Sequence, residues 1–138
     1  MRVEIEFTTG RIGPRSDLPP ECGGRAGAVV EFSGRVRADE DGRPIAALEY
    51  SLEQSVVERL IRDRAGCLDG RFPCLHVRVI HRTGIIPVGE TPLQIVAVSV
   101  HRSEALGMVG ALLDYIKEDL PVVKRPIGTD DSSRKNIA

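Results

Sequence analysis

Apolar and polar residues alternate along several short stretches of this chain, and such alternation predicts β-strands. The predicted strands are residues 2–8, 28–32, 45–50, 75–81 and 93–100. The last of them is apolar almost throughout, which is typical of a central strand. Residues 28–50 place two of these strands on either side of a polar turn at 39–44, and this pattern predicts a long hairpin.

Two stretches repeat their apolar residues every three to four positions, which predicts amphipathic helices. The first covers residues 52–65, with Ser51 as its cap and Gln54 as the capping-box partner. The second opens at Ser103 and stops at Pro121, because a proline disfavours helical backbone in the residue before it. Its predicted buried side consists of Leu106, Val109, Leu112, Leu113 and Ile116.

Glycine and proline punctuate the remaining stretches. They are dense in residues 9–26, which predicts a mobile loop, and they mark a further loop at 83–89. The polar end, 128–138, is predicted to be a flexible tail. With 138 residues the chain is expected to form a single domain, 1–138, and helices added to hairpin-linked strands favour an α+β fold.

Charge and composition narrow the function classes. The net charge is −1, from 19 basic and 20 acidic residues, which argues against a nucleic-acid or acidic-membrane binder. No apolar run is long enough to span a membrane or to form a signal-peptide core, so a cytoplasmic protein is expected. Three cysteines without a CxxC pair predict neither a disulfide framework nor a metal site.

The first candidate for chemistry is the junction at 100–104, where a buried strand gives way to a helix within three residues. The first N–H groups of a helix lack partners and carry partial positive charge. His101 and Arg102 add hydrogen-bond donors there, which indicates an anion site. The alternative is that Arg102 pairs with a nearby carboxylate and His101 caps the sheet.

Further cations follow along the chain. Lys117 shares a predicted helix face with Ser103, Leu106, Gly110 and Leu113. Gly107 and Gly110 have no side chains, which suggests that another group approaches this part of the helix closely. The ordinary alternative for Lys117 is that its alkyl chain lies along apolar surface while its ammonium group stays in water.

Lys124 and Arg125 stand between Pro121 and Pro126, close enough to Lys117 for both lysines to face one pocket. Arg35 and Arg37 would point the same way on an extended segment. The alternative for each basic pair is simple solvation. These features share hydrogen-bond donors and positive charge, and together they predict one pocket for a small anion over residues 99–125. His76 and His81 are expected to be structural.

Several motifs, taken in order, then carry a family resemblance. They are Phe32-Ser33-Gly34-Arg35-Val36-Arg37, Leu48-Glu49-Tyr50, Val79-Ile80-His81-Arg82-Thr83-Gly84, Pro87-Val88-Gly89-Glu90, Val96-Ala97-Val98-Ser99-Val100-His101-Arg102-Ser103-Glu104-Ala105, Leu113-Asp114-Tyr115-Ile116-Lys117 and Pro121-Val122-Val123-Lys124-Arg125. Spread over about residues 27 to 126, they resemble the large, catalytic subunit of molybdopterin synthase.

The resemblance implies an α/β-hammerhead fold with a mostly antiparallel sheet and two main helices. It implies a homodimer that binds a ubiquitin-like small subunit at each end, giving a heterotetramer. The implied reaction transfers sulfur from the thiocarboxylated Gly-Gly tail of the small subunit to cyclic pyranopterin monophosphate, forming the dithiolene of molybdopterin. It implies no cofactor, metal, nucleic acid or membrane.

The resemblance also implies roles for particular residues. Lys117 and Lys124 would be catalytic, with Lys117 meeting the thiocarboxylate carbonyl. The implied substrate-binding residues are Arg35, Val36, Arg37, His101, Arg102, Lys117, Lys124, Arg125 and Pro126. Gly107 and Gly110 would help to line a channel for the Gly-Gly tail.

The chain departs from the family pattern at three places. Pro126 stands where the family usually has a glutamate, the tail has no aromatic residue, and Ser51-Leu52-Glu53-Gln54 replaces a Tyr-Pro-x-Met type of sequence. Two alternatives therefore stay open beside the enzyme. One is a non-catalytic paralogue that binds a ubiquitin-like tail or a phosphorylated ligand, and the other is an enzyme acting on a different cyclic phosphate.

Overall fold

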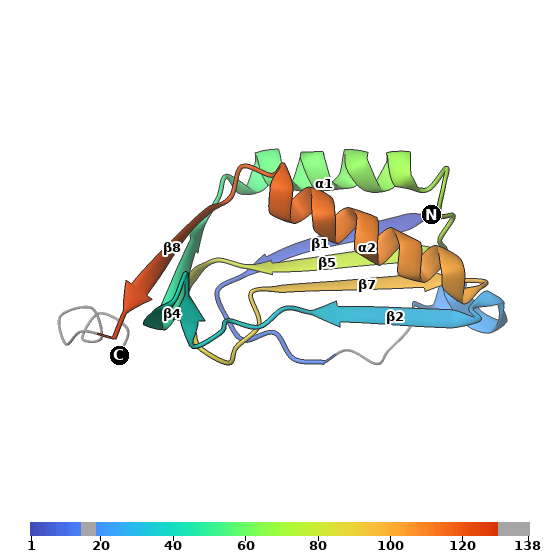
Figure 1. Cartoon of the computed structure of the whole chain (residues 1–138). Coiled ribbons are helices and arrows are strands. Elements are labelled where there is room, and N and C mark those ends of the chain that lie inside the picture. The colour runs from blue at the N-terminus through green and yellow to red at the C-terminus, as the bar shows by residue number, and fades with distance from the viewer. Residues whose placement is uncertain (15–18, 130–138) are drawn as a thin grey trace.

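Two β-sheets of unequal size form the framework of the computed structural model, which describes residues 1–14 and 19–129 (Figure 1). The large sheet has the order β1-β5-β7-β2, and its strands are β1 (Arg2–Thr8), β5 (His76–Arg82), β7 (Leu93–Ser99) and β2 (Ala28–Ser33). β1 runs parallel to β5, and the other neighbours are antiparallel. The small sheet pairs β4 (Arg43–Ser51) with β3 (Asp39–Glu40), β6 (Gly84–Pro87) and β8 (Val123–Gly128), all antiparallel.

Two helices, α1 (Gln54–Leu68) and α2 (Arg102–Glu118), cover one face of the large sheet (Figure 1). α1 packs over β1, and α2 packs over β7 and β2. The main core lies between helices and sheet, and every residue of β7 is buried, which confirms its prediction as a central strand. A second, smaller core of Val36, Ile45, Leu48 and Ile86 belongs to the small sheet.

These elements confirm the expected α+β fold of the hammerhead type, with two main helices and mostly antiparallel strands. The small sheet stands at one end of the large sheet, beyond the last turn of α2 (Figure 1). Among the described residues, no helix is long and apolar enough to cross a membrane.

The long hairpin predicted over 28–50 is wrong. β2 pairs with β7 in the large sheet, whereas β4 belongs to the small sheet, so residues 34–38 carry the chain from one sheet to the other. Alternation identifies strands but not their partners. The real hairpin is shorter and joins β3 to β4 through Asp41 and Gly42, both at positive φ, as a two-residue hairpin turn requires. The predicted loop at 83–89 also contains a strand, β6, which pairs with β4.

Two details of the helices differ from prediction. Ser51 ends β4 instead of capping α1, which begins at Gln54 with no side-chain cap and continues to Leu68. Leu106 was predicted to be buried in α2 but is 56% exposed, and the buried residues are Ala105, Met108, Val109, Leu112 and Ile116. Val109, Leu112 and Ile116 confirm the prediction, and the face that contacts the sheet is completed by Ala105 and Met108 in place of Leu106.

The predicted mobile loop and flexible tail fall partly on residues 15–18 and 130–138, outside the described residues. Within the described part of 9–26, Pro20–Arg25 forms a short 3-10 helix. Gly128, the first residue of the predicted tail, belongs to β8.

Candidate functional site

Two of the cations predicted to share one pocket, Arg102 and Lys117, lie at opposite ends of α2. Arg102 is the first residue of this helix and Lys117 lies in its last turn. They are 15 residues apart, which corresponds to about 22 Å at the rise of an α-helix. Figure 1 shows the last turn beside β8 and the first turn at the opposite end of the sheet. The prediction of a single pocket over 99–125 is therefore wrong within one chain.

The first turn of α2 is held to the end of β7 by the side chain of Ser99. Its hydroxyl donates to the carbonyl oxygen of His101 and accepts the backbone N–H of Ala105 at 3.1 Å. This contact satisfies one of the free N–H groups that a helix N-terminus presents. His101 and Arg102 remain exposed, and Arg102 forms no ion pair with any described residue. The predicted alternative, a carboxylate partner for Arg102, is not found among the described residues.

Glu104 and Gly27 also shape this end, and the sequence patterns gave no signal for Gly27. The hydrogen bond from Ser103 lowers the pKa of the Glu104 carboxyl, and the nearby His101 lowers it further. Gly27 donates its N–H to the carbonyl of Ser99, and a side-chain carbon at Gly27 would lie only 2.0 Å from the carbonyl oxygen of Val100. Only glycine fits there, and one glycine in a glycine-rich loop gives no signal of this contact.

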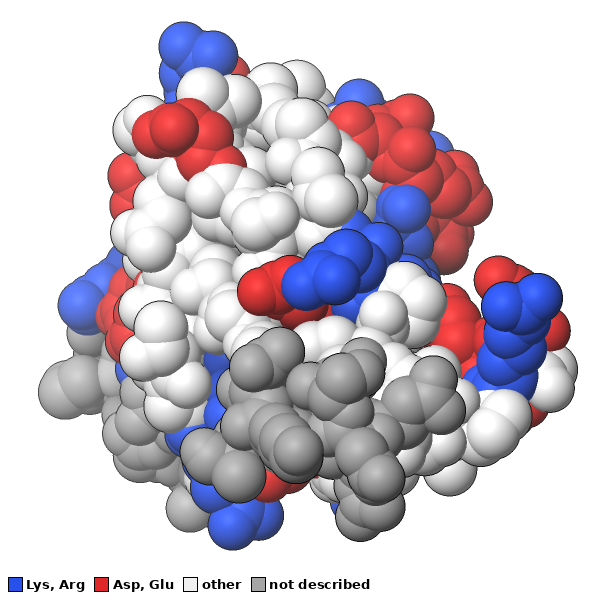
Figure 2. All heavy atoms as spheres, turned by 90° about the vertical axis from the view of Figure 1, so that its left-hand side faces the viewer, with Lys and Arg blue, Asp and Glu red and all other residues white. Residues whose placement is uncertain are grey.

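The lysine end of α2 lies beside the small sheet. Lys117 is exposed, and Lys124 and Arg125 are neighbours on β8. Consecutive strand residues point to opposite faces. Lys124 accordingly pairs with Glu40 (Nζ to Oε1 3.0 Å), and Arg125 pairs with Glu49 (Nη2 to Oε1 2.5 Å). Figure 2 views this end of the molecule and shows basic side chains with acidic ones beside them.

The segment Arg35-Val36-Arg37 joins the two sheets close to the small one. Val36 belongs to the small core and is 3% exposed. Its backbone N–H donates to the carbonyl oxygen of Glu90 (N to O 3.0 Å), and its carbonyl oxygen accepts the N–H of Gly89 (N to O 2.8 Å). Arg35 and Arg37 are exposed, which agrees with the predicted alternation. The segment thus presents two guanidinium groups from a rigidly bonded backbone.

Pro126 lies on the same face of β8 as Lys124 and pairs with Leu48 of β4. β8 pairs with β4 alone among the described strands, so it forms an edge of the small sheet. An edge position tolerates a residue without an N–H group. The departure from the family pattern at this position is therefore compatible with the strand.

Half-buried Tyr50 and buried His81 lie beneath Lys124. Tyr50 is opposite Lys124 in the β4–β8 register, and its ring meets that of His81 edge-on at 5.6 Å between centroids. Burial raises the pKa of Tyr50, Lys124 lowers it and Glu40 raises it. Burial lowers the pKa of His81, which fits its predicted structural role. These neighbours come from strand pairing, which the sequence patterns did not reveal.

The two glycines of α2 differ in their surroundings. A side-chain carbon at Gly107 would lie 2.3 Å from the ring of Phe72, so this glycine makes room for a residue of the same chain. Nothing lies within 4 Å of the corresponding position at Gly110, and the neighbouring Leu106 is exposed. Only Gly110 is therefore open to a partner, contrary to the expectation that both glycines line a channel.

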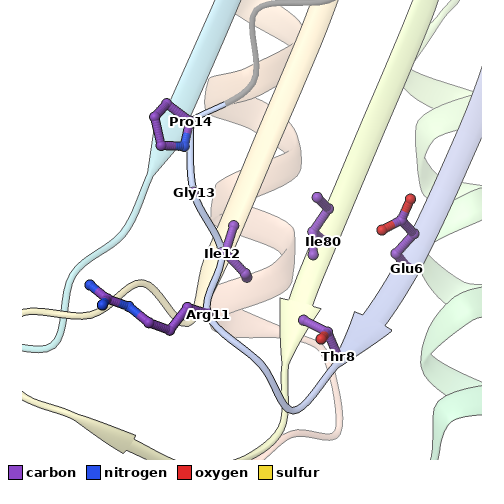
Figure 3. A pocket seen from close by; sticks show the side chains of 7 residues that line it. All are labelled: Glu6, Thr8, Arg11, Ile12, Gly13, Pro14 and Ile80. Atoms are coloured by element: carbon purple, nitrogen blue, oxygen red, sulfur yellow. The ribbon is translucent and has the colours of Figure 1, made fainter.

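A cavity of about 340 Å³ lies elsewhere, on the face of the large sheet that the helices leave uncovered. Its walls are Glu6, Thr8, Arg11, Ile12, Gly13, Pro14 and Ile80 (Figure 3). Arg11 extends away from the strands (Figure 3), and its Nε lies 3.7 Å from the carboxylate of Glu90. None of the predicted site residues lines this cavity, and it lacks their concentration of donors. In the described ranges, no group of three or more His, Cys, Asp or Glu side chains is placed to hold a metal ion.

Comparison with known proteins decides the family. A family model described as "MoaE protein" matches residues 16–119. The chain belongs to the MoaE family. Among curated relatives, the molybdopterin synthase catalytic subunit of Thermoplasma volcanium is 36% identical over 123 residues, covering 89% of this chain and 90% of that protein. The rat subunit of the same name is 32% identical over 133 residues, covering 94% of this chain but 64% of the rat protein.

Solved structures of this family share the fold. A molybdopterin synthase from Staphylococcus aureus matches with a TM-score of 0.78 at 24% identity, covering 91% of both chains. A complex of subunits 1 and 2 of molybdopterin-converting factor from Helicobacter pylori matches with a TM-score of 0.68 at 17% identity, covering 92% of this chain and 85% of the other. At these identities the structures support the fold and not the details of the site.

Proposed function

We propose that this protein is the catalytic subunit of a molybdopterin synthase. It would transfer sulfur from the thiocarboxylated Gly-Gly tail of a ubiquitin-like small subunit to cyclic pyranopterin monophosphate, and so form the dithiolene of molybdopterin. The observation that carries this proposal is the set of cations at one end of the molecule, where α2 ends beside β8, in a chain of the MoaE family.

The substrate explains why this end holds donors and cations. A cyclic phosphate is an anion that guanidinium and ammonium groups recognise. Arg35 and Arg37 would bind it from the inter-sheet segment, and Arg125 from β8 beside Pro126. The backbone at Val36 would hold the two arginines in place through its bonds to Gly89 and Glu90.

The two lysines would carry the chemistry. Lys117 would meet the carbonyl of the thiocarboxylate and assist proton transfer, and Lys124 would stabilise negative charge that develops during sulfur transfer. Gly110, with open space above it on α2, would let the Gly-Gly tail approach the helix. The external sulfur donor leaves the protein's own cysteines, none of which forms a disulfide within the described residues, without a catalytic role.

The separation of His101 and Arg102 from Lys117 supports a homodimer. If both ends of α2 contact one substrate, the distance of about 22 Å requires the first turn of one copy to meet the lysine end of the other. A two-fold dimer supplies two such sites. The small subunit would dock at each site to give a heterotetramer, and the Helicobacter pylori complex of two subunits supports such a partner. We also propose a cytoplasmic location, where cysteines stay reduced, as in the described part of this chain, whose cysteines form no disulfide.

The decisive experiment combines the purified protein with thiocarboxylated small subunit and cyclic pyranopterin monophosphate. We expect the dithiolene product to accumulate, measured by mass spectrometry, while the small subunit returns to its carboxylate form. Binding of both partners without product would overturn the enzyme in favour of a non-catalytic paralogue. Turnover of a different cyclic phosphate, with none of the pterin, would overturn the substrate.

A further inference from the structure

The ammonium group of Lys124 is held by a carboxylate from a distant part of the chain. Glu40, the last residue of β3, places Oε1 3.0 Å from Nζ of Lys124. The side chain of Glu40 is only 19% exposed, compared with 45% for Lys124. An ion pair with one partly buried member is less screened by water than a pair on the open surface.

The backbone around Glu40 places its side chain close to Lys124. Asp41 and Gly42, both at positive φ, form the tight turn that follows Glu40 directly. The pairing of β4 with β8 shifts register between Ile45 and Ala47, and such an irregularity bends a strand. Through this turn and this bend, β3 meets β8 although the two strands are not neighbours in the sheet.

Tyr50 lies next to the same ion pair, on β4, which pairs with both β3 and β8. It faces Lys124 in the register of β4 and β8, and its phenol responds to the charges of both Lys124 and Glu40. Lys124, Glu40 and Tyr50 therefore form one cluster on one face of the small sheet. Pro126, the next residue of β8 on that face, has no acidic group to contribute.

We propose that Glu40 is a positioning residue for Lys124: it fixes the lysine ammonium over Tyr50, in the place from which the lysine acts on the substrate. This inference rests on the proposed function, in which Lys124 is catalytic. Glu40 itself would touch neither the pterin nor the thiocarboxylate.

A negative charge at Glu40 has two opposite consequences for a site that binds an anion. A carboxylate beside a site for an anionic substrate repels that substrate, so its removal would be expected to improve binding and preserve turnover. A positioning role predicts the reverse for turnover, because a small misplacement of a catalytic group can cost a large factor in rate. Glu40→Gln separates the two, since it removes the charge and keeps the shape of the side chain.

The first test measures kcat and KM for dithiolene formation in Glu40→Gln, Glu40→Asp and the wild-type protein. We expect Glu40→Gln to lower kcat about tenfold or more without raising KM for the pterin, and Glu40→Asp to recover part of the loss. Glu58→Gln is the matched control, because Glu58 is an ion-paired carboxylate on α1, 4.0 Å from Arg62. Circular dichroism and Tm establish that each variant folds.

The second test needs no substrate. The chain has two tyrosines, so a Tyr115→Phe background isolates the ultraviolet titration of Tyr50. Lys124 lowers the pKa of Tyr50 more than Glu40 raises it. If Glu40→Gln releases Lys124, the pKa of Tyr50 should therefore rise, whereas loss of the Glu40 charge alone, with Lys124 still in place, would lower it. Glu58→Gln should leave the pKa of Tyr50 unchanged.

The outcomes separate this inference from the proposed function. A wild-type protein that forms no dithiolene refutes the function, while the Tyr50 titration still decides whether Glu40 holds Lys124. A normal kcat in Glu40→Gln, or a Tyr50 pKa that falls or stays unchanged in this variant, overturns the positioning role even if the enzyme is active.

Discussion

At the scale of single residues, the cations of the candidate site differ in how they are held. Lys124 and Arg125 each have a carboxylate partner, whereas Lys117 forms no ion pair with any described residue. An exposed lysine without a partner keeps its donors free for a ligand. This difference supports the role proposed for Lys117, in which it meets the carbonyl of the thiocarboxylate.

Replacing Lys117 by Ala should reduce dithiolene formation about 100-fold or more, because a donor aimed at developing charge is lost. The Tm should stay close to that of the wild type, since the side chain is exposed. Arg102→Ala should mainly raise KM for the pterin. Steady-state kinetics check both, and a Lys117→Ala variant with normal turnover would refute the assigned role.

His81 makes the stability of the fold depend on pH. Burial holds its pKa below the ordinary value of 6.5, so the folded protein keeps the ring neutral. Below pH 6.5 the unfolded chain binds a proton that the folded chain refuses, and the free energy of unfolding must fall as the pH drops. Below the lowered pKa of the folded state this loss stops.

Urea unfolding at pH 7.5 and 5.5 tests this prediction. The wild type should lose more stability between the two pH values than His81→Gln, in which the titrating group is absent. The comparison between the two proteins isolates His81 from the other titrating residues. Equal losses in the two proteins would show that His81 does not carry the effect.

At the scale of elements, α2 is the part of the molecule that organises the site. Its buried stripe packs on β7 and β2, its first turn presents His101 and Arg102, and its last turn presents Lys117. The helix also contains two glycines with different surroundings. Phe72 fills the space over Gly107, and open space lies over Gly110.

These glycines should respond oppositely to the same substitution. Gly107→Ala places a methyl group against the ring of Phe72 and should destabilise the fold by about 1–3 kcal/mol. Gly110→Ala meets nothing in this chain and should stabilise the helix by about 1 kcal/mol. Urea unfolding measures both changes. If Gly110 faces the Gly-Gly tail, the stabilised variant should also bind the small subunit less tightly.

At the scale of the whole molecule, the length of α2 sets the organisation of the site. One chain cannot bring Arg102 and Lys117 to the same small substrate, because the helix holds them about 22 Å apart. In the proposed dimer, the first turn of α2 from one copy would meet the lysine end of the other copy. Each chain would then supply anion binding to one site and a lysine to the other.

Mixed dimers test this arrangement. Arg102→Ala and Lys117→Ala should each be impaired, but a mixed dimer contains one site with both substitutions and one intact site. At a pterin concentration well below KM, where both variants are impaired, co-expression should therefore recover about a quarter of the wild-type activity, since about half of the dimers are mixed and each of these has one intact site. Activity no higher than the average of the two variants would place each complete site within one chain.

The sequence by itself determined five strands, β1, β2, β4, β5 and β7, together with the two main helices and the α+β class. It also predicted a site of cations and hydrogen-bond donors. Those features depend on local periodicity and residue type, which a single chain displays directly. The strands β3, β6 and β8, the strand partners, and the neighbours of Lys124 and Gly107 were decided only by the tertiary structure. The physical reason is that alternation marks a strand without naming its partner. The contact of Glu40 with Lys124 joins strands that are distant in sequence. The length of the helix α2 keeps Arg102 and Lys117 apart, although the sequence analysis expected them in one pocket.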